Sequence, residues 1–345
     1  MVPTGAQLDL AVLRALPKVE LHVHLEGTFS APRIVAMAAD AGRPLPRPVD
    51  QLFHSDDLSE FLRFLDWTCA LIRTPQLAAE VAYDFARRAA ADGTLYAEVI
   101  INPTHWPHWE LGELVESLTS GFEQAQADGL TECRLLLSIL RTQAAEEALQ
   151  LVEWMGATRP RRVVGLSIDG DERRAGRTSG RFAPAYARAA QLGYGLTAHA
   201  GESSGAEGVH DALDLLHVTR IDHGVRVVDE PELMARLVRE HITLNVCLTS
   251  NLMHLYPDLK AHPLPSLEAA GVSSTINTDD PGLLEITLTG EFAASAELMN
   301  WGYAQLTVVT RRAIEAAFCP PATKFRLHLA VDSFLTTLPE RDRQP

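Results

Sequence analysis

Short apolar runs alternate with longer amphipathic stretches along most of the chain. The runs have the length of β-strands and are bounded by turn-forming residues. We therefore predict strands at residues 19–24, 94–101, 131–139, 162–168, 195–199, 220–223, 242–247 and 272–277.

Helical periodicity fills the gaps between these runs, for example at residues 76–92, 111–128, 143–155 and 231–241. Strands that alternate with helices predict parallel strands joined by helical crossovers. Eight such units predict a closed (β/α)8 TIM barrel. An open doubly wound sheet is the alternative, but no glycine-rich dinucleotide fingerprint follows the first strand.

Two regions contain helical patterns in addition to the eight strand–helix units. Residues 52–92 hold more than one helical pattern, and we expect part of them to cap the mouth of the barrel. Residues 286–345 are helical in pattern and are expected to pack on the outside as a C-terminal tail. Because no low-complexity linker interrupts the chain, we predict a single domain over residues 1–345.

Composition and charge narrow the class of protein. The chain is 46% hydrophobic and 22% charged, which is typical of a globular protein. No apolar run is long enough for a membrane span, and the N-terminus lacks the pattern of a signal peptide. The cysteines form no CxxC pair, which favours the reducing cytoplasm. A net charge of −15 argues against nucleic acid as a partner and leaves a small neutral molecule open.

Polar residues end several of the predicted strands, where the active site of a parallel barrel lies. His22 and His24 end the first strand, and residues two apart on a strand share a face. His199 ends the fifth strand, and Glu202 follows in the next loop. We interpret the histidines as metal ligands and Glu202 as a general acid/base beside a metal-bound water. Ordinary surface histidines and a helix-capping glutamate are the alternatives.

The sixth and eighth strands end in the same way. His223 is placed to orient or polarise a water, or else is a buried structural histidine. Asp222 should point away from His223 and anchor the barrel. Asp279 and Asp280 are costly to bury together unless one binds a metal and the other meets the substrate. Capping of a helix that begins at Pro281 would account for one of them only.

Three imidazoles and a carboxylate suit zinc with an open position for water, whose pKa zinc lowers to about 7. Binuclear barrel hydrolases often bridge their two metals with a carboxylated lysine on a middle strand. Lys18, Lys260 and Lys324 are all placed elsewhere, which favours a single metal. We therefore predict one Zn²⁺ per chain.

Four segments closely resemble the adenosine/adenine deaminase family, in the right order over residues 16–292. They are Leu-Pro-Lys-Val-Glu-Leu-His-Val-His-Leu-Glu-Gly at 16–27, His-Ala-Gly-Glu at 199–202, Cys-Leu-Thr-Ser-Asn at 247–251 and Thr-Asp-Asp-Pro at 278–281. The resemblance implies the (β/α)8 fold, a single catalytic zinc and hydrolytic loss of the 6-amino group of a purine.

The resemblance also implies a role for each matching residue. Glu202 protonates the purine N1 and shuttles protons, and His223 positions the attacking hydroxide. Asp280 meets N7 of the ring, and the backbone N–H of Gly170 meets N3. Gly170 is supplied by the resemblance alone. The implied zinc ligands are His22, His24, His199 and Asp279.

The motifs divide on the substrate. Adenosine-specific members usually carry Asp, which contacts the ribose, where this chain has Glu26, and Glu is typical of relatives acting on free adenine or modified purines. Residues 211–216 and 220–224 also look like the adenine branch, whereas 247–251 and 276–282 look like bacterial adenosine deaminases. We take adenosine or deoxyadenosine as first choice, with free adenine, a modified adenine or aminodeoxyfutalosine as alternatives. His24 and Glu26 are expected to contact the substrate.

Other classes of protein fit less well. A barrel hydrolase that cleaves a ring amide or phosphoester would need the missing bridging lysine. A non-catalytic nucleoside-binding protein would not need every catalytic group. The zinc site of cytidine deaminases needs a Pro-Cys-x-x-Cys element, which is absent. Histidines without a partner motif are interpreted as surface or loop residues, namely His54, His210, His217, His241, His254, His262 and His328.

Overall fold

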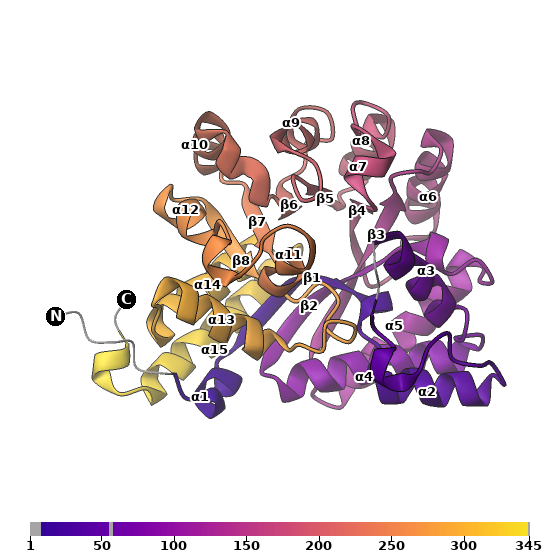
Figure 1. The fold of residues 1–345 in the computed structure, drawn as a ribbon, viewed down its shortest axis with the longest axis horizontal. Helices are drawn as coiled ribbons and strands as arrows, with labels where there is room; N and C mark the ends of the chain where they lie inside the picture. Colours follow the sequence, from indigo (N-terminus) through magenta and orange to yellow (C-terminus); the bar gives the residue numbers. More distant parts are fainter. Residues whose placement is uncertain (1–7, 55–57, 344–345) are drawn as a thin grey trace.

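Eight parallel strands follow one another in chain order around a nearly closed barrel, with helices on the outside (Figure 1). The computed structural model describes residues 8–54 and 58–343. Each predicted strand is present, with its ends shifted by at most one residue. The strands are β1 (Lys18–His24), β2 (Thr94–Ile101), β3 (Glu132–Leu140), β4 (Val163–Asp169), β5 (Gly195–Ala200), β6 (Arg220–His223), β7 (Thr243–Val246) and β8 (Ser273–Ile276).

The predicted helices between strands are confirmed, and shorter helices and 3₁₀ turns occupy the loops. The α-helices are α1 (Leu10–Ala15), α2 (Ala31–Asp40), α3 (Leu58–Cys69), α4 (Pro75–Ala91), α5 (Leu111–Ala127), α6 (Ala145–Thr158), α7 (Glu172–Ala175), α8 (Ala183–Gln191), α9 (Ala206–Asp214), α10 (Pro231–Glu240), α11 (Leu248–His254), α12 (Leu264–Ala269), α13 (Leu288–Met299), α14 (Tyr303–Ala316) and α15 (Pro321–Thr337). The 3₁₀ turns are η1 (Leu25–Gly27), η2 (Val49–Gln51), η3 (Pro103–His105), η4 (Val225–Asp229), η5 (Leu259–Ala261) and η6 (Glu340–Asp342).

Local sequence explains where individual elements begin and end. Helix α4 starts where the Thr74 side chain accepts a hydrogen bond from the N–H of Leu77, with Pro75 in the first turn. Gly93 then turns the chain into β2 with a φ of +81°, and a side chain there would meet the carbonyl oxygen of Arg14. Because parallel barrel strands are buried on both faces, β2 and β3 are nearly continuous apolar runs.

The barrel closes at the carboxyl ends of its first and last strands. Val23 in β1 pairs with Asp279, just beyond β8, in an isolated parallel bridge. The N–H of His24 donates to the carbonyl oxygen of Asp279 at 2.8 Å, and the N–H of Asp279 donates to that of His22 at 3.1 Å. The main chain itself therefore brings the histidines of β1 beside the Asp279 carboxylate.

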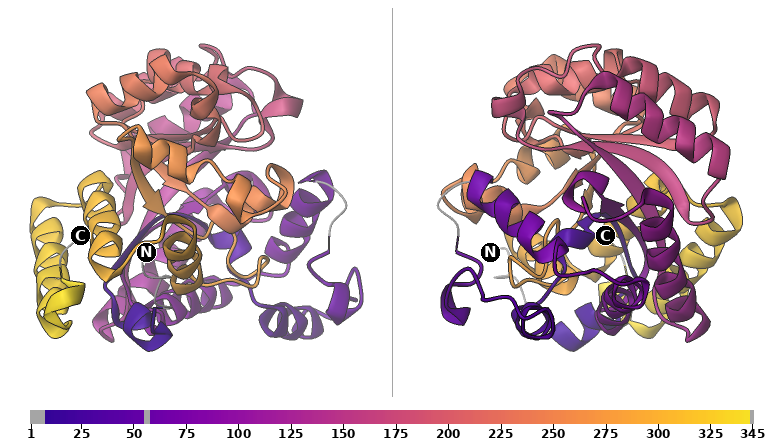
Figure 2. Two further views of the ribbon diagram at one scale, coloured as in Figure 1. Left: turned by 60° about the vertical axis from the view of Figure 1, so that its left-hand side comes forward. Right: turned by 90° about the vertical axis from the view of Figure 1, so that its right-hand side faces the viewer.

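The C-terminal helices pack on the outside of the barrel, as predicted up to residue 343. Helices α14 and α15 lie against one side of it (Figure 2). Their Ala313, Ile314, Leu327 and Val331 form a cluster of buried side chains with residues of β1 and β2. The ends of the predicted 1–345 domain, residues 1–7 and 344–345, lie outside the described residues.

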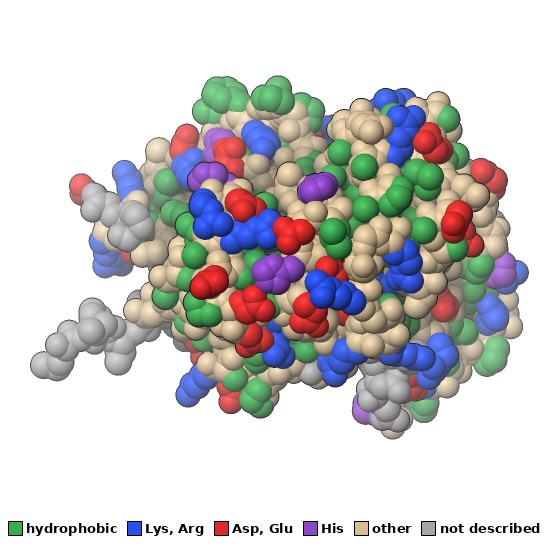
Figure 3. Space-filling view, turned by 90° about the horizontal axis from the view of Figure 1, so that it is seen from above, with side chains coloured by type: hydrophobic (Ala, Val, Ile, Leu, Met, Phe, Trp, Pro, Cys, Tyr) green, Lys and Arg blue, Asp and Glu red, His purple; other side chains and the backbone are tan. Residues whose placement is uncertain are grey.

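Two further features are the distribution of surface charge and the hydrophobicity of the helices. Lys and Arg side chains are interspersed with Asp and Glu on the face shown in Figure 3. Within residues 8–54 and 58–343, no helix is both long and apolar enough to cross a membrane.

Candidate metal centre and active site

Side chains from four strand ends meet inside the mouth of the barrel. Nε2 of His22 lies 3.1 Å from Oδ1 of Asp279, and Nε2 of His24 lies 3.5 Å from the same oxygen. Nε2 of His24 also lies 3.1 Å from Nε2 of His199. His223 completes the group, and single ligand atoms of His22, His199, His223 and Asp279 all lie within 4.8 Å of one another. The predicted metal ligands are therefore close enough to share one cation.

The ring contacts of the histidines fit a bound cation. Nδ1 of His199 lies 2.9 Å from the carbonyl oxygen of Ile168, which accepts its proton, so the lone pair of Nε2 faces the centre. Burial lowers the pKa of His199 well below its usual range, and also lowers that of His24. Two neutral imidazoles thus turn Nε2 atoms toward each other at 3.1 Å, an arrangement that a metal between them would stabilise.

The charges around His22 also indicate that a cation binds at this point. Burial lowers the pKa of His22, but the flanking carboxylates of Asp222 and Asp279 outweigh burial and raise it to about 10. Two buried carboxylates therefore require positive charge at this point. A divalent cation supplies that charge when it replaces the proton on Nε2.

Asp222 supports the centre from within the barrel. Its Oδ1 lies 3.1 Å from Nδ1 of His22, and its carboxylate accepts hydrogen bonds from Asn245 at 2.8 Å and Ser167 at 3.3 Å. The expected anchoring role is thus combined with contact to a ligand, because metal-binding imidazoles are commonly oriented by a carboxylate on the other ring nitrogen.

His24 and His223 both lie where a third imidazole ligand would stand. The His24 contacts are the shorter, because Nε2 of His223 lies 3.7 Å from Oδ2 of Asp279. That same His223 nitrogen lies 3.7 Å from Oε1 of Glu202.

A cavity of about 80 Å³ opens onto this cluster. Phe61, Leu62 and Leu65 of α3 line it, so the expected cap over the barrel mouth is present. The other lining residues are polar: His24, His105, Asp169, Gly170, Asp171, His199, Glu202, His223, Asp279 and Asp280. Burial raises the pKa of Glu202, an effect that the nearby His223 reduces, which favours a carboxyl group that can donate a proton.

Two carboxylate oxygens at this cavity are buried and lack hydrogen-bond partners among the described residues. They are Oδ1 of Asp280 and Oδ2 of Asp169. The other oxygen of Asp169 accepts a hydrogen bond of 2.6 Å from the side chain of Asn102. A side chain at Gly27 would lie 1.8 Å from Oδ1 of Asp280, so glycine is required there to leave room for this aspartate. Unpaired buried carboxyl oxygens of this kind indicate a polar ligand that hydrogen-bonds to them.

Glu26 lies behind the wall of the cavity, where it supports Asn102. Its Oε1 accepts hydrogen bonds from the N–H of Asn102 at 2.9 Å and from the indole of Trp106 at 2.8 Å. Glu26 is not among the described residues that line the cavity. Its contact with substrate stays a prediction.

The family model described as adenosine deaminase matches residues 17–334. The chain belongs to the adenosine deaminase family. Like the rest of this family, the protein is a hydrolase of the deaminase type.

Three relatives show which members of the family this chain is similar to. An adenine deaminase from Cupriavidus necator is 35% identical over 335 residues, which are 95% of this chain and 95% of the relative. The structure of an amidohydrolase from Burkholderia ambifaria with bound Zn has a TM-score of 0.86 and 30% identity, and the match covers 97% of both chains. The adenine deaminase of Arthrobacter aurescens has a TM-score of 0.87 and 28% identity, with 93% of this chain and 100% of that chain covered. The names of the first and third relatives correspond to our alternative, free adenine, and do not support adenosine.

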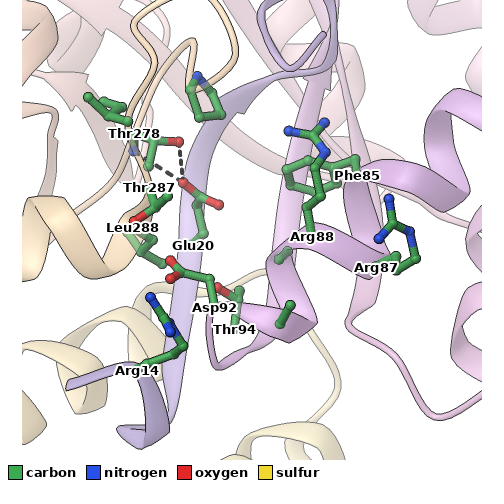
Figure 4. Close-up of a pocket in the computed structure, with 14 residues that line it drawn as sticks. Arg14, Glu20, Phe85, Arg87, Arg88, Asp92, Thr94, Thr278, Thr287 and Leu288 are labelled. Atoms are coloured by element: carbon green, nitrogen blue, oxygen red, sulfur yellow. Dashed lines mark hydrogen bonds between the residues drawn. The ribbon is translucent and has the colours of Figure 1, made fainter. Parts of the chain in front are cut away.

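The deaminase also has a larger cavity, of about 400 Å³, beside β1. Figure 4 shows Glu20 in this cavity with its carboxylate bonded to Thr278. Oε1 of Glu20 accepts hydrogen bonds from the N–H and the hydroxyl of Thr278, at 3.1 and 2.5 Å. Because none of the clustered metal-ligand candidates lines this cavity, we interpret Glu20 as an anchor for the segment that carries Asp279.

Sequence reasoning overlooked several residues of the site. Asp169 ends β4 and was open to the same strand-end argument that found the others. His262 was expected on the surface or in a loop. It lies in the short loop between η5 and α12, but it is only 2% exposed, and its Nε2 lies 3.2 Å from Oδ1 of Asn251. No sequence pattern marked it, because its partners lie in α11 and at the start of α12.

Glu172 was also missed, and it holds the loop that carries Glu202. Its buried carboxylate accepts backbone hydrogen bonds from Gly201, Glu202 and Ser204 at 3.1, 2.9 and 3.1 Å. The hydroxyl of Ser204 adds a fourth bond of 2.8 Å. One side chain thus determines the path of the backbone around Glu202.

We expect Glu172→Gln to lower kcat about tenfold, while KM and metal content stay near wild type. The amide N–H₂ of glutamine would face the backbone N–H groups of the loop and could not accept their hydrogen bonds. Steady-state kinetics and metal analysis measure this. Glu207→Gln is the matched control, since Glu207 is an exposed glutamate in the first turn of α9 that accepts from the N–H of Gly205. An unchanged kcat in Glu172→Gln would remove this role.

Proposed function

We propose that this protein is a metal-dependent adenine deaminase, which converts free adenine and water to hypoxanthine and ammonia. The observation that carries the proposal is one cavity that brings together the metal-ligand cluster, Glu202 and two unpaired carboxylate oxygens. The adenine deaminases among the relatives support the choice of purine.

The residues that would hold the metal are His22, His24, His199 and Asp279. Zinc fits these nitrogen and oxygen donors, and a structural relative contains Zn. When bound, zinc lowers the pKa of water to about 7 and so makes a nucleophile available at neutral pH.

The reaction depends on proton transfer by Glu202. Its raised pKa lets the carboxyl donate a proton to N1 of the ring. Protonation of N1 makes C6 more electron-poor, so the oxygen of water adds at C6 and the C6–N6 bond breaks to release ammonia. The attacking water returns one proton to Glu202, and its second proton passes to the departing N6 amino group, so that ammonia leaves as the C6=O bond forms. Nε2 of His223 lies 3.7 Å from Oε1 of Glu202, where it can stabilise charge.

The purine is oriented by groups on the cavity wall. We place Asp280 at N7 and the backbone N–H of Gly170 at N3, as the family pattern implies. Burial and the neighbouring Asp279 raise the pKa of Asp280 well above its usual range, so its protonated carboxyl can donate to the lone pair of N7. Because N9 lies beside N3 on the ring edge, the residue before Gly170 faces N9. That residue is Asp169, whose Oδ2 is the unpaired acceptor.

This placement favours free adenine over adenosine. Adenine carries a proton on an imidazole nitrogen and can donate it to Asp169. In adenosine, N9 is bonded to ribose and has no proton to donate, so the buried carboxylate oxygen would stay unpaired. A hydrogen bond to a charged group contributes about 1.5–3 kcal/mol, and an unpaired buried acceptor adds its desolvation cost.

We expect kcat/KM for adenine to exceed that for 9-methyladenine and adenosine by about 100-fold or more. Loss of the adenine absorbance band and release of ammonia measure it. Asp169→Asn keeps an acceptor for Asn102 but places an amide donor toward N9, so it should lower kcat/KM for adenine toward that of 9-methyladenine. Similar turnover of adenine and 9-methyladenine by the wild type would contradict the role of Asp169. Failure to deaminate adenine would contradict the proposed function.

A further inference from the structure

A line of buried side chains leads from His223 away from the cavity. Nδ1 of His223 lies 3.1 Å from Nδ2 of Asn251 in α11. Oδ1 of Asn251 lies 3.2 Å from Nε2 of His262. Nδ1 of His262 in turn accepts a 3.1 Å hydrogen bond from the backbone N–H of Leu264, at the start of α12. His223, Asn251 and His262 are 1%, 0% and 2% exposed, so water does not compete for these bonds.

The backbone end of this line determines the direction of every hydrogen bond in it. A backbone N–H can only donate, so Nδ1 of His262 is the acceptor and carries no proton. In a neutral imidazole the proton is then on Nε2, which donates to Oδ1 of Asn251. The amide of Asn251 consequently turns its N–H₂ toward His223.

The number of protons on the His262 ring excludes the opposite orientation of the Asn251 amide. It would turn N–H₂ toward His262, whose two ring nitrogens would then both have to be acceptors. A neutral imidazole has only one acceptor nitrogen. Burial lowers the pKa of His262 to about 4, so the ring is neutral at physiological pH.

The line ends at the metal centre. Because Asn251 donates to Nδ1 of His223, that nitrogen carries no proton, and the proton of the imidazole is on Nε2. That nitrogen lies 3.7 Å from both Oε1 of Glu202 and Oδ2 of Asp279. An N–H at this position can donate a hydrogen bond to an oxygen, but it has no lone pair with which to bind a metal.

We propose that Asn251 and His262 are positioning residues that hold His223 in its Nε2–H form, in which Nε2 can donate a hydrogen bond to the attacking oxygen. This inference rests on the proposed deaminase function for its kinetic consequence. The tautomer itself follows from the contacts and can be tested without a substrate.

The decisive variant is Asn251→Asp, which replaces one amide nitrogen by oxygen. A carboxylate accepts from both sides, so it would draw the proton of His223 onto Nδ1 and turn the Nε2 lone pair toward the metal. We expect kcat to fall about 100-fold or more, with KM within about threefold and the metal retained. In serine proteases the wrong histidine tautomer lowers kcat about 10⁴-fold. A kcat within about threefold of wild type would overturn the proposal.

A spectroscopic measurement tests the tautomer independently of turnover. In metal-loaded protein with ¹⁵N-labelled histidine, the two ring nitrogens of His223 should give a protonated Nε2 and an unprotonated Nδ1. The His223 signals are assigned by their loss in His223→Gln. A protonated Nδ1 in the wild type would refute the inference whatever the substrate proves to be, whereas inactivity toward adenine would refute only the proposed function.

A second pair of variants decides the matter if Asn251→Asp does not fold. His262→Gln keeps an N–H donor for Asn251 and should retain kcat within about threefold, whereas His262→Leu removes the donor and should lower kcat about tenfold or more. Equal kcat in the two variants would count against the line of hydrogen bonds. Asn300→Asp, an exposed change of the same type at the end of α13, is the control and should resemble wild type.

Discussion

Glu202→Gln is expected to keep its metal and to lose nearly all turnover. The amide has the shape of the carboxyl group but cannot transfer a proton to N1 and recover one from water. The backbone of residue 202 stays held, because its N–H donates to Glu172 at 2.9 Å whichever side chain is present. General acid/base catalysis contributes about 10²–10⁴-fold, so we expect kcat to fall about a thousandfold.

Kinetics and metal analysis on the same preparation test this expectation. Glu207→Gln, the exposed change at the start of α9, should leave both quantities unchanged. A rate for Glu202→Gln within about tenfold of wild type, which is about 1.4 kcal/mol in barrier height, would remove Glu202 from its role. Loss of metal from this variant would instead make Glu202 a ligand.

The second large effect concerns the metal. Asp279→Ala should lose its metal on dialysis and its activity with it, because Oδ1 of Asp279 is the carboxylate oxygen close to both His22 and His24, at 3.1 and 3.5 Å. Its Oδ2 accepts a 2.7 Å hydrogen bond from Ser250, which orients the carboxylate. Removing the only anionic donor of the set leaves three neutral imidazoles, which hold a divalent ion less tightly.

Asp279 has a φ of +65°, so alanine there also adds backbone strain. Asp279→Asn avoids this difficulty, because asparagine tolerates a left-handed conformation, and it should bind metal more weakly than wild type while folding normally. Asp280→Asn is the matched control and should keep its metal. Full metal content in Asp279→Ala after dialysis would contradict the ligand assignment.

The geometry explains why these two changes should act differently. Glu202 and Asp279 both contact His223 at 3.7 Å, but only Asp279 approaches the Nε2 atoms of the β1 histidines. One residue therefore acts on protons and the other on the cation. Measuring metal content beside turnover separates the two roles.

Sequence alone was sufficient for the framework of the barrel and for most of its mouth. The strands were predictable because most of them contain short apolar or β-branched runs, which are a local property of the chain. The polar residues at the strand ends were predictable because, in a parallel barrel, all of these ends meet at one mouth. His22, His199 and Asp279 were placed together on that basis, and their atoms lie within reach of one cation.

Only the tertiary structure decided how these groups are supported and oriented. The hydrogen bonds from Glu172 to residues 201–204 link the segments that follow β4 and β5. Those from His262 through Asn251 to His223 link the segment that follows β7 to the end of β6. The unpaired oxygen of Asp169 likewise depends on what surrounds it. Hydrogen-bond direction depends on which donor faces which acceptor in three dimensions, and hydrophobic periodicity carries no information about that.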